Sequence, residues 1–259
     1  MLKVVWIFSF YLTILTSCKP VPQTIGLILP NSESIIADTF GLNYIMGKFE
    51  PSKHPDFVVI PSKYRDETVR YLRRDVMIKF AEMADAAAKE GVRLIIRSAT
   101  RNFDSQKQIW ENKWKGFTIL EDGSKASDIK DEFLRAKKIL LYSSMPGTSR
   151  HHWGTDVDIN SFENSWFAGG EGARLYAWME SNASQYGFCQ VYGPINSFRK
   201  HGYQEEKWHW SYLPIAQRIQ EEAAKKMNNK MISGFDGSHK AMTIDMVKVY
   251  MLSIDPACM

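Results

Sequence analysis

The sequence predicts an α+β fold in which a small, mostly antiparallel sheet is flanked by helices. Helix-like and strand-like segments alternate loosely along the chain, without the repeated strand–helix–strand units that build a parallel sheet. The strand-like segments are short, whereas the helical segments run for several turns. The length of 259 residues suits one fair-sized domain with its own core and short extensions.

The spacing of apolar residues predicts the helices. Between Asp66 and Glu90, apolar side chains recur at three- and four-residue steps, and Gly91 ends the segment. Asp104 is placed to cap a second helix that runs through Trp114. Further helices are expected over residues 128–142, 172–186 and 214 to about 227.

Short apolar runs bounded by turn residues predict the strands. These runs are Val92–Ile96, Thr155–Ile159, Phe188–Val191 and Trp208–Tyr212. Residues 19 to about 60 have no clear periodicity and contain several prolines. We therefore expect a tether there, followed by a loosely ordered lead-in.

The first residues have the features of an export signal. Met-Leu-Lys is a positive start, and an apolar run from Val4 to Leu15 follows, too short to span a bilayer comfortably. The next residues, up to Cys18, resemble a bacterial lipobox with Cys18 as the lipidated residue. We expect an exported bacterial lipoprotein, membrane-anchored through its N-terminal lipid and facing the periplasm or cell exterior. A plain signal peptide with an incidental cysteine is the alternative.

The two remaining cysteines allow two interpretations. In an exported chain, Cys189 and Cys258 can form a disulfide, and two separate thiols are the other possibility. The sequence leaves both open.

The charge balance is mildly basic, with a net charge of +4. The sequence has no Lys/Arg run of the kind that nucleic-acid-binding proteins carry, so we expect no nucleic-acid partner. A basic surface would suit an anionic cell-wall polymer, although ordinary solvated charge explains the balance as well.

A dense polar cluster precedes and enters the predicted strand 155–159. A catalytic zinc site uses three nitrogen or carboxylate-oxygen ligands and keeps one position open for water. Asp158 shares one face of this strand with Asp156, because side chains alternate along a strand. His151, in the preceding loop, can meet Asp158 on one metal ion if Gly154 lets the chain bend back.

A third ligand and a base are available near the predicted strand 208–212. His209 lies within that strand, and Glu206 lies just before it. A carboxylate in that position can stand beside a metal without binding it, take a proton from water and pass it to a leaving amine. Each cluster alone is weak, but together they favour a metal site.

Three motifs occur in order along the chain. Ser98, Arg101 and Gln106 fit S-G-Y-R-S-Y-x-x-Q. Ser149, His151, Gly154 and Asp158 fit S-x-H-x-x-G-x-A-x-D. Glu206–Trp210 fits E-x-W-H-W, with Gly202-Tyr203 before it. Over about residues 65–215, the chain therefore resembles the VanY-like D-alanyl-D-alanine carboxypeptidases, whose wider group includes hedgehog-type domains.

The resemblance implies a hedgehog/D,D-peptidase-like fold with one zinc ion per chain. His151, Asp158 and His209 would hold the zinc, and Glu206 would be the catalytic base. This is the same assignment that the spacing of the residues favours.

The resemblance also implies substrate-binding roles. Arg101 and Gln106 would grip the substrate, because a guanidinium suits a carboxylate or the oxyanion of a tetrahedral intermediate. Ser149 would hydrogen-bond the substrate or orient its loop. A surface-turn arginine, a solvated helix glutamine and a simple turn serine are the alternatives.

Asp156 departs from the family pattern, which usually has a small residue at this position. It can be a hydrogen-bond acceptor behind a ligand histidine. It can also raise the pKa of the base by like-charge repulsion. Both remain open, and the register of the motif places His152 outside the site, either behind a ligand or exposed.

These observations divide the chain into four parts. They are a lipoprotein signal peptide (1–17), a tether and lead-in (18–64), a zinc peptidase catalytic domain (65–215), and a C-terminal helix and tail packed on the domain (216–259).

The expected function is removal of a C-terminal D-alanine from peptidoglycan stem peptides by a zinc-dependent carboxypeptidase of D,D or L,D preference. A D-Ala-D-Ala dipeptidase or a peptidoglycan endopeptidase on the same fold is an alternative. An inactive cell-wall binding module is another, against which Glu206 argues because binding alone needs no base.

Overall fold

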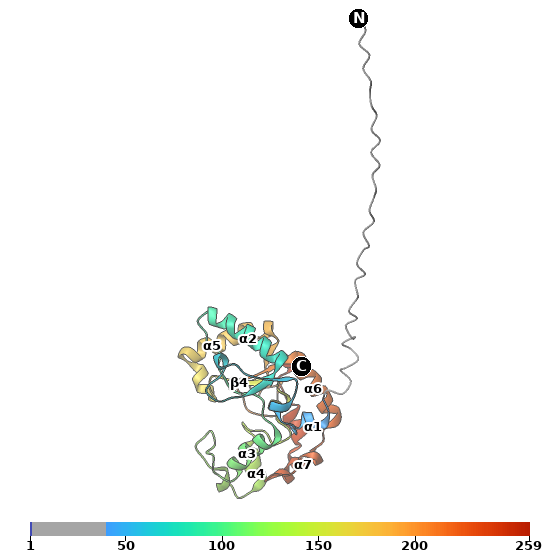
Figure 1. Cartoon of the computed structure of the whole chain (residues 1–259). Coiled ribbons are helices and arrows are strands. Elements are labelled where there is room, and N and C mark those ends of the chain that lie inside the picture. Colours follow the sequence, from blue (N-terminus) through green and yellow to red (C-terminus); the bar gives the residue numbers. More distant parts are fainter. Residues whose placement is uncertain (2–39) are drawn as a thin grey trace. The chain divides into compact units, whose positions relative to one another are not determined.

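A four-stranded antiparallel sheet organises the part of the chain that the computed structural model describes, which is Met1 and residues 40–259. Its strand order is β3 (Ile96–Ser98), β4 (Asp156–Ile159), β6 (His209–Tyr212) and β5 (Phe188–Gln190). Helices flank this sheet (Figure 1). The predicted α+β class with a small antiparallel sheet is confirmed.

One face of the sheet packs on two long helices. These are α2 (Arg74–Lys89) and α5 (Gly170–Asn182), which lie on the same side of β4 in Figure 1. Val157 and Ile159 of β4 are fully buried in the hydrophobic cluster that contains the apolar faces of both helices. Because side chains alternate along a strand, Asp156 and Asp158 face the other way.

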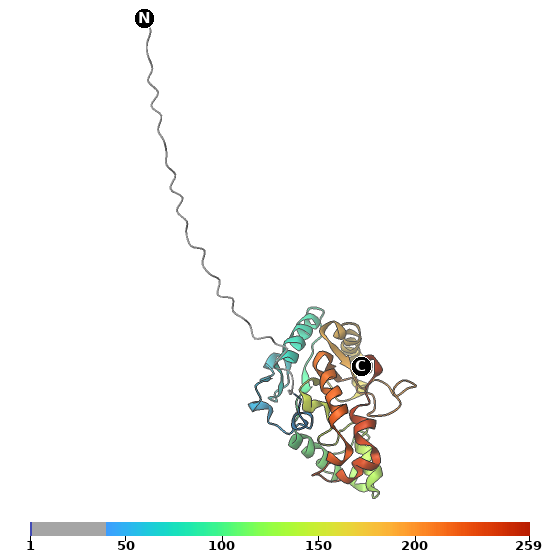
Figure 2. The same cartoon turned by 90° about the vertical axis from the view of Figure 1, so that its right-hand side faces the viewer.

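A second hydrophobic cluster gathers the remaining helices. These are α1 (Leu42–Ile45), α3 (Phe103–Trp114), α4 (Glu132–Ile139), α6 (Leu213–Lys226), α7 (Ala241–Ile244) and a π-helix (Val247–Met251). Figure 2 shows the C-terminal helices, in orange and red, running along this side. Residues 216–259 thus contribute buried side chains such as Ile219 and Met251.

Residues 40–64 differ from the loosely ordered lead-in that we expected. The strand β1 (Phe57–Val59) pairs with β2 (Tyr71–Arg73), and Ile45 and Ile60 are fully buried. These residues are ordered by contacts with distant segments, since the Tyr44 hydroxyl donates to the Trp153 carbonyl at 2.7 Å. Local periodicity cannot reveal such contacts.

Several predicted boundaries shift by a few residues. The helix expected from Asp66 begins at Arg74, because residues 71–73 are paired in β2. Asn102, and not Asp104, caps α3, with its side chain accepting from the Ser105 N–H at 2.9 Å. Strand β3 begins only at Ile96.

Short 3₁₀ helices complete the described part of the chain: Pro51–Lys53, Ser62–Tyr64, Ala126–Asp128, Arg150–Trp153, Asn164–Ala168, Ala183–Tyr186, Asn229–Met231, Ser238–Lys240 and Pro256–Cys258. None of the helices among the described residues has both the length and the apolar character needed to cross a membrane. The predicted signal peptide and the lipobox cysteine, Cys18, lie outside the described residues.

The structure joins Cys189 and Cys258 in a disulfide, with their Cα atoms 5.8 Å apart. The bond links β5 to the last 3₁₀ helix, Pro256–Cys258, across a sequence separation of 69 residues.

Candidate active site

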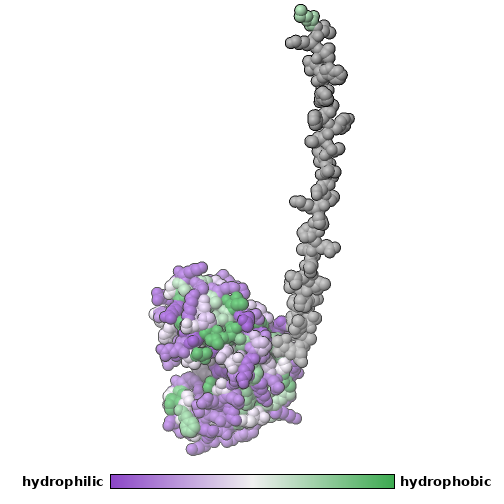
Figure 3. Space-filling view, viewed as in Figure 1, coloured by the Kyte–Doolittle hydropathy of each residue, from purple (hydrophilic) through white to green (hydrophobic). Residues whose placement is uncertain are grey.

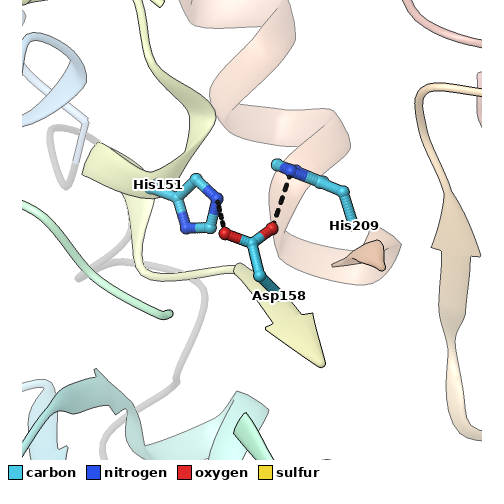
Figure 4. A group of neighbouring side chains, drawn as sticks. All are labelled: His151, Asp158 and His209. Atoms are coloured by element: carbon cyan, nitrogen blue, oxygen red, sulfur yellow. Dashed lines mark ion pairs between the residues drawn. The ribbon is translucent and has the colours of Figure 1, made fainter. Parts of the chain in front are cut away.

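Three potential metal ligands meet at one point (Figure 4). His151 Nε2 lies 3.2 Å from Asp158 Oδ2, and His209 Nδ1 lies 3.2 Å from Asp158 Oδ1. The candidate ligand atoms of all three residues lie within 4.8 Å of one another. Their side chains are buried, with exposed fractions of 3%, 6% and 4%.

The sheet and one glycine turn produce this meeting. The β4–β6 register places Asp158 directly opposite His209. His151 comes from the 3₁₀ helix Arg150–Trp153, which ends at Gly154 with a left-handed φ of +71°. That φ turns the chain from the helix into β4, and an L side chain at this position would be strained.

Hydrogen bonds orient both imidazole rings. His151 Nδ1 lies 2.8 Å from the Ala99 carbonyl oxygen, and His209 Nε2 lies 2.8 Å from Asp156 Oδ2. Both partners can only accept, so we assign the ring hydrogens to these two nitrogens. The remaining nitrogens, His151 Nε2 and His209 Nδ1, are left with lone pairs that face Asp158.

These residues fit a divalent zinc ion. Two imidazole nitrogens and a carboxylate are a donor set that catalytic zinc uses. Asp158 Oδ1 is buried and receives no hydrogen bond from a donor in the described residues. Burial lowers the pKa of His151, and that favours the neutral ring that a metal needs.

Glu206 stands beside this donor set. Its Oε2 lies 3.2 Å from His209 Nδ1, and its side chain is 7% exposed. Burial raises the pKa of Glu206, although His209 opposes the shift. Its backbone is fixed, because the Glu206 N–H donates to the Tyr192 carbonyl at 2.9 Å and Gln190 donates to the Glu206 carbonyl at 3.2 Å.

Arg101 reaches the site from the loop before α3. Its Nη1 lies 3.7 Å from Asp158 Oδ2 and donates to Ser98. Its Nε donates to Gln106 Oε1 at 2.9 Å, and Gln106 Nε2 donates to the Ser144 carbonyl at 2.8 Å. The oxygen and the nitrogen of the Gln106 amide are therefore both hydrogen-bonded, and Gln106 links Arg101 to the backbone at Ser144.

Three buried hydroxyls at the site have no partner among the described residues: Thr100 Oγ1, Ser149 Oγ and Tyr203 Oη. All three residues line the same cavity as the three potential ligands. Ser149 was a sequence candidate. Tyr203 was not, although its place before the third motif was a signal for it.

The cavity has a volume of about 530 Å³. It is lined by the donor set, Glu206 and Arg101, and by aromatic residues that include Tyr142, Phe162 and Trp208. Trp208 is 6% exposed, and it also lines this cavity. Figure 3 shows the surface recessed between the part that carries α3 and α4 and the part that carries α2 and α5.

Asp156 and His152 lie behind the site. Asp156 accepts a hydrogen bond from His209. Of the two roles that the sequence left open for Asp156, this contact favours that of an acceptor behind a ligand histidine over that of a like charge beside the base. His152 is fully buried; its Nδ1 lies 2.7 Å from the Arg101 carbonyl oxygen, and its Nε2 accepts from the Gly147 N–H at 3.0 Å. It therefore joins the Arg101 loop to the loop that leads to His151.

An α+β chain with a His/Asp/His donor set beside a buried carboxylate has the arrangement found in metal-dependent hydrolases. Residues 69–215 match the family described as VanY, D-alanyl-D-alanine carboxypeptidase, and the chain belongs to this family. The resemblance seen in the three motifs is thereby confirmed.

Curated relatives match over much of the chain. YodJ of Bacillus subtilis (strain 168) is 31% identical over 191 residues, covering 71% of this chain and 62% of YodJ. A D-alanyl-D-alanine carboxypeptidase of Enterococcus faecalis (strain ATCC 700802 / V583) is 29% identical over 178 residues, covering 65% of this chain and 58% of that protein. The chain thus spans about three-fifths of the length of these relatives.

Solved structures of similar proteins include the LD-carboxypeptidase LdcB, with 26% identity, a TM-score of 0.49, and coverage of 68% of this chain and 76% of LdcB. They also include a VanY D,D-pentapeptidase in complex with Zn(II), with 26% identity, a TM-score of 0.46, and coverage of 62% of this chain and 87% of that one.

Proposed function

We propose that this chain is a zinc-dependent carboxypeptidase that removes a C-terminal D-alanine from peptidoglycan stem peptides. The observation that carries the proposal is the placement of Glu206 Oε2 at 3.2 Å from His209 Nδ1, the nitrogen that faces Asp158. A general base beside three potential ligands is what metal-assisted peptide hydrolysis requires.

The donor set would hold one zinc ion through His151, Asp158 and His209. Such an ion supplies Lewis-acid polarisation of the scissile carbonyl and lowers the pKa of water. Glu206 accepts the proton of the attacking water and then gives it to the amine of the departing D-alanine. Its raised pKa suits both tasks, because the group must take up and release a proton near neutral pH.

Arg101 and Ser149 are placed to bind the negative charge of the substrate. A guanidinium and a hydroxyl are donors for the C-terminal carboxylate or for the developing oxyanion. Gln106 and Ser98 hold the guanidinium in place, so Gln106 acts through Arg101. The unpartnered hydroxyl of Ser149 is free to donate to a substrate.

The test is hydrolysis of defined muropeptides by the purified protein. We expect release of free D-alanine from a stem peptide, loss of this activity after chelation, and its return on addition of zinc. Activity that survives complete removal of metal would overturn the proposal. A pentapeptide and a tetrapeptide separate D,D from L,D preference, free D-Ala-D-Ala reveals a dipeptidase, and a cross-linked dimer reveals an endopeptidase.

The protein is further proposed to act at a membrane, anchored by a lipid on Cys18. Cys18→Ser should move the exported protein from the membrane fraction to the soluble fraction. Sedimentation of this variant with membranes, as for the wild type, would rule out the lipid anchor.

A further inference from the structure

A fully buried ion pair lies directly behind the donor set. Arg150 Nε is 2.9 Å from Asp156 Oδ2, and the two side chains are 1% and 0% exposed. Neither residue is among those that line the cavity. The pair is therefore not placed to touch a substrate, and the Asp156–His209 hydrogen bond links its side chains to a candidate ligand.

All the contacts of Asp156 are strong and directional. Its Oδ2 accepts from Arg150 Nε and, at 2.8 Å, from His209 Nε2. Its Oδ1 accepts from the hydroxyls of Ser211 and Thr155 at 2.6 and 2.7 Å. A buried carboxylate with four donors has no freedom to rotate.

Arg150 is fixed as firmly as its partner. Its Nη1 donates to Gln220 of α6 at 2.6 Å, and its Nη2 donates to Ser211 at 2.8 Å. The guanidinium carbon lies 4.5 Å from the centre of the Trp153 ring. The pair thus ties together the 3₁₀ helix before Gly154, both central strands and α6.

His209 and His151 have different hydrogen-bond acceptors. The acceptor of His209 is the Asp156 carboxylate, and that of His151 is the Ala99 backbone carbonyl. Both acceptors hold a ring hydrogen and leave the other nitrogen facing Asp158. Only the partner of His209 is charged, and a carboxylate raises the basicity of a ligand histidine. His209 should therefore be the stronger of the two nitrogen donors.

Arg150 offsets the cost of burying the negative charge of Asp156. Asp156 adds a negative charge to a buried region that already holds Asp158 and Glu206, and an uncompensated buried charge is costly. Arg150 neutralises it within the pair.

We propose that Asp156, neutralised by Arg150, is a positioning residue that fixes the His209 ring with Nδ1 toward the metal position and strengthens zinc binding by the chain. This inference rests on the proposed zinc site. It concerns metal affinity, whereas the proposed function concerns hydrolysis.

Zinc affinity, measured by competition with a chromophoric chelator on the folded full-length mature chain, tests the inference. Asp156→Asn keeps the shape of the side chain but replaces the carboxylate, and we expect zinc to bind about 10–100-fold more weakly. The double variant Arg150→Met/Asp156→Ala removes both charges, so no guanidinium is left unpaired. It should show a loss of the same size.

Ser211→Ala is the matched control. It removes the hydrogen bonds that Ser211 makes with Oδ1 of Asp156 and with Nη2 of Arg150, but leaves the contacts of Oδ2 with His209 and with Arg150 Nε. Its zinc affinity should stay within about twofold of the wild type, even if its thermal stability falls.

Wild-type zinc affinity in both Asp156 variants would overturn the inference, as would an equal loss of affinity in Ser211→Ala. A wild-type protein that binds zinc but releases no D-alanine would end the proposed function and leave this inference standing. A wild-type protein that binds no zinc would end both.

Discussion

Three buried carboxylates lie within one small region, and their surroundings give them different properties. Burial opposes the ionisation of Asp158, but His151 and His209 hold its pKa well below the usual range. Burial likewise opposes the ionisation of Asp156, but Arg150, His209 and His151 together more than compensate, so its pKa is lowered. For Glu206 the opposing effects of His209 and Arg101 are smaller than the effect of burial, which raises its pKa. The carboxylate suited to proton transfer is therefore Glu206.

Glu206→Gln tests this division of roles. The amide keeps the size of the side chain but cannot accept a proton, so we expect kcat to fall by about 10²–10⁴-fold with zinc content unchanged. Glu205→Gln makes the same chemical change one residue earlier, outside the cavity lining, and should keep wild-type turnover. If Glu206→Gln loses its zinc, Glu206 is a ligand, and one of the three proposed ligands is wrong.

His152 makes stability depend on pH. Burial lowers its pKa from 6.5 to about 3, so the folded chain holds the ring neutral while the unfolded chain protonates it. Its contribution is complete above the unfolded pKa and is lost as pH falls from 6.5 toward about 3. By linkage, protonation of His152 in the unfolded chain should lower the free energy of unfolding of the wild type by about 2 kcal/mol between neutral pH and about pH 5.

Denaturant unfolding of the wild type and of His152→Gln at both pH values measures this effect. The variant has no titrating group at this position, so its stability should fall by about 2 kcal/mol less over the same interval. Equal falls in the two proteins would show that His152 is not held neutral in the fold.

At the level of elements, the site depends on the turn at Gly154 and on the register between β4 and β6. The β4–β6 register sets Asp158 opposite His209, and a one-residue slip of either strand would turn the side chain that it carries to the other face of the sheet. Gly154 brings His151 to the same point. A β-carbon at Gly154 would overlap the ring of Phe57 in β1. The ordered lead-in thus forms the wall against which the turn packs.

Gly154→Ala should therefore lower the free energy of unfolding by at least about 1–3 kcal/mol, from the left-handed φ alone. It should also weaken zinc binding, because His151 moves with the turn. Gly169→Ala is a suitable control, since Gly169 has an extended backbone and no atom within 4 Å of an added β-carbon. Denaturant melts that show equal stability for both variants would contradict the role assigned to Gly154.

Across the whole molecule, two hydrophobic clusters lie on either side of the sheet, and the donor set lies between them. The C-terminal segment belongs to the second cluster, and the disulfide fastens its end to β5. Gln190, at the end of β5, and Tyr192, just after it, hydrogen-bond the backbone of Glu206. The C-terminus is thus connected to the site through one strand.

The double variant Cys189→Ser/Cys258→Ser tests this connection. A cross-link across 69 residues should contribute about 4 kcal/mol in the chain-entropy model, so we expect a loss of roughly 2–5 kcal/mol. Non-reducing peptide mapping of the wild type should recover the two cysteines in one linked pair. Recovery of both as free thiols would show that the bond does not form in the protein.

The sequence alone was sufficient for features that depend on neighbours along the chain. Apolar spacing located the bodies of α2 and α6, and strand alternation placed Asp156 and Asp158 on one face. Ordered motifs singled out His151, Asp158, His209 and Glu206, which the structure brings together.

Only the tertiary structure revealed the features that depend on distant residues. The ordering of residues 40–64 requires contacts such as Tyr44 with Trp153, 109 positions away, and the role of Asp156 requires His209, 53 positions away. His152 and Tyr203 likewise acquire their surroundings from other segments. Periodicity reports only which side of its own helix or strand a residue occupies, whereas the packing of that side against a particular distant segment is decided by the assembled fold.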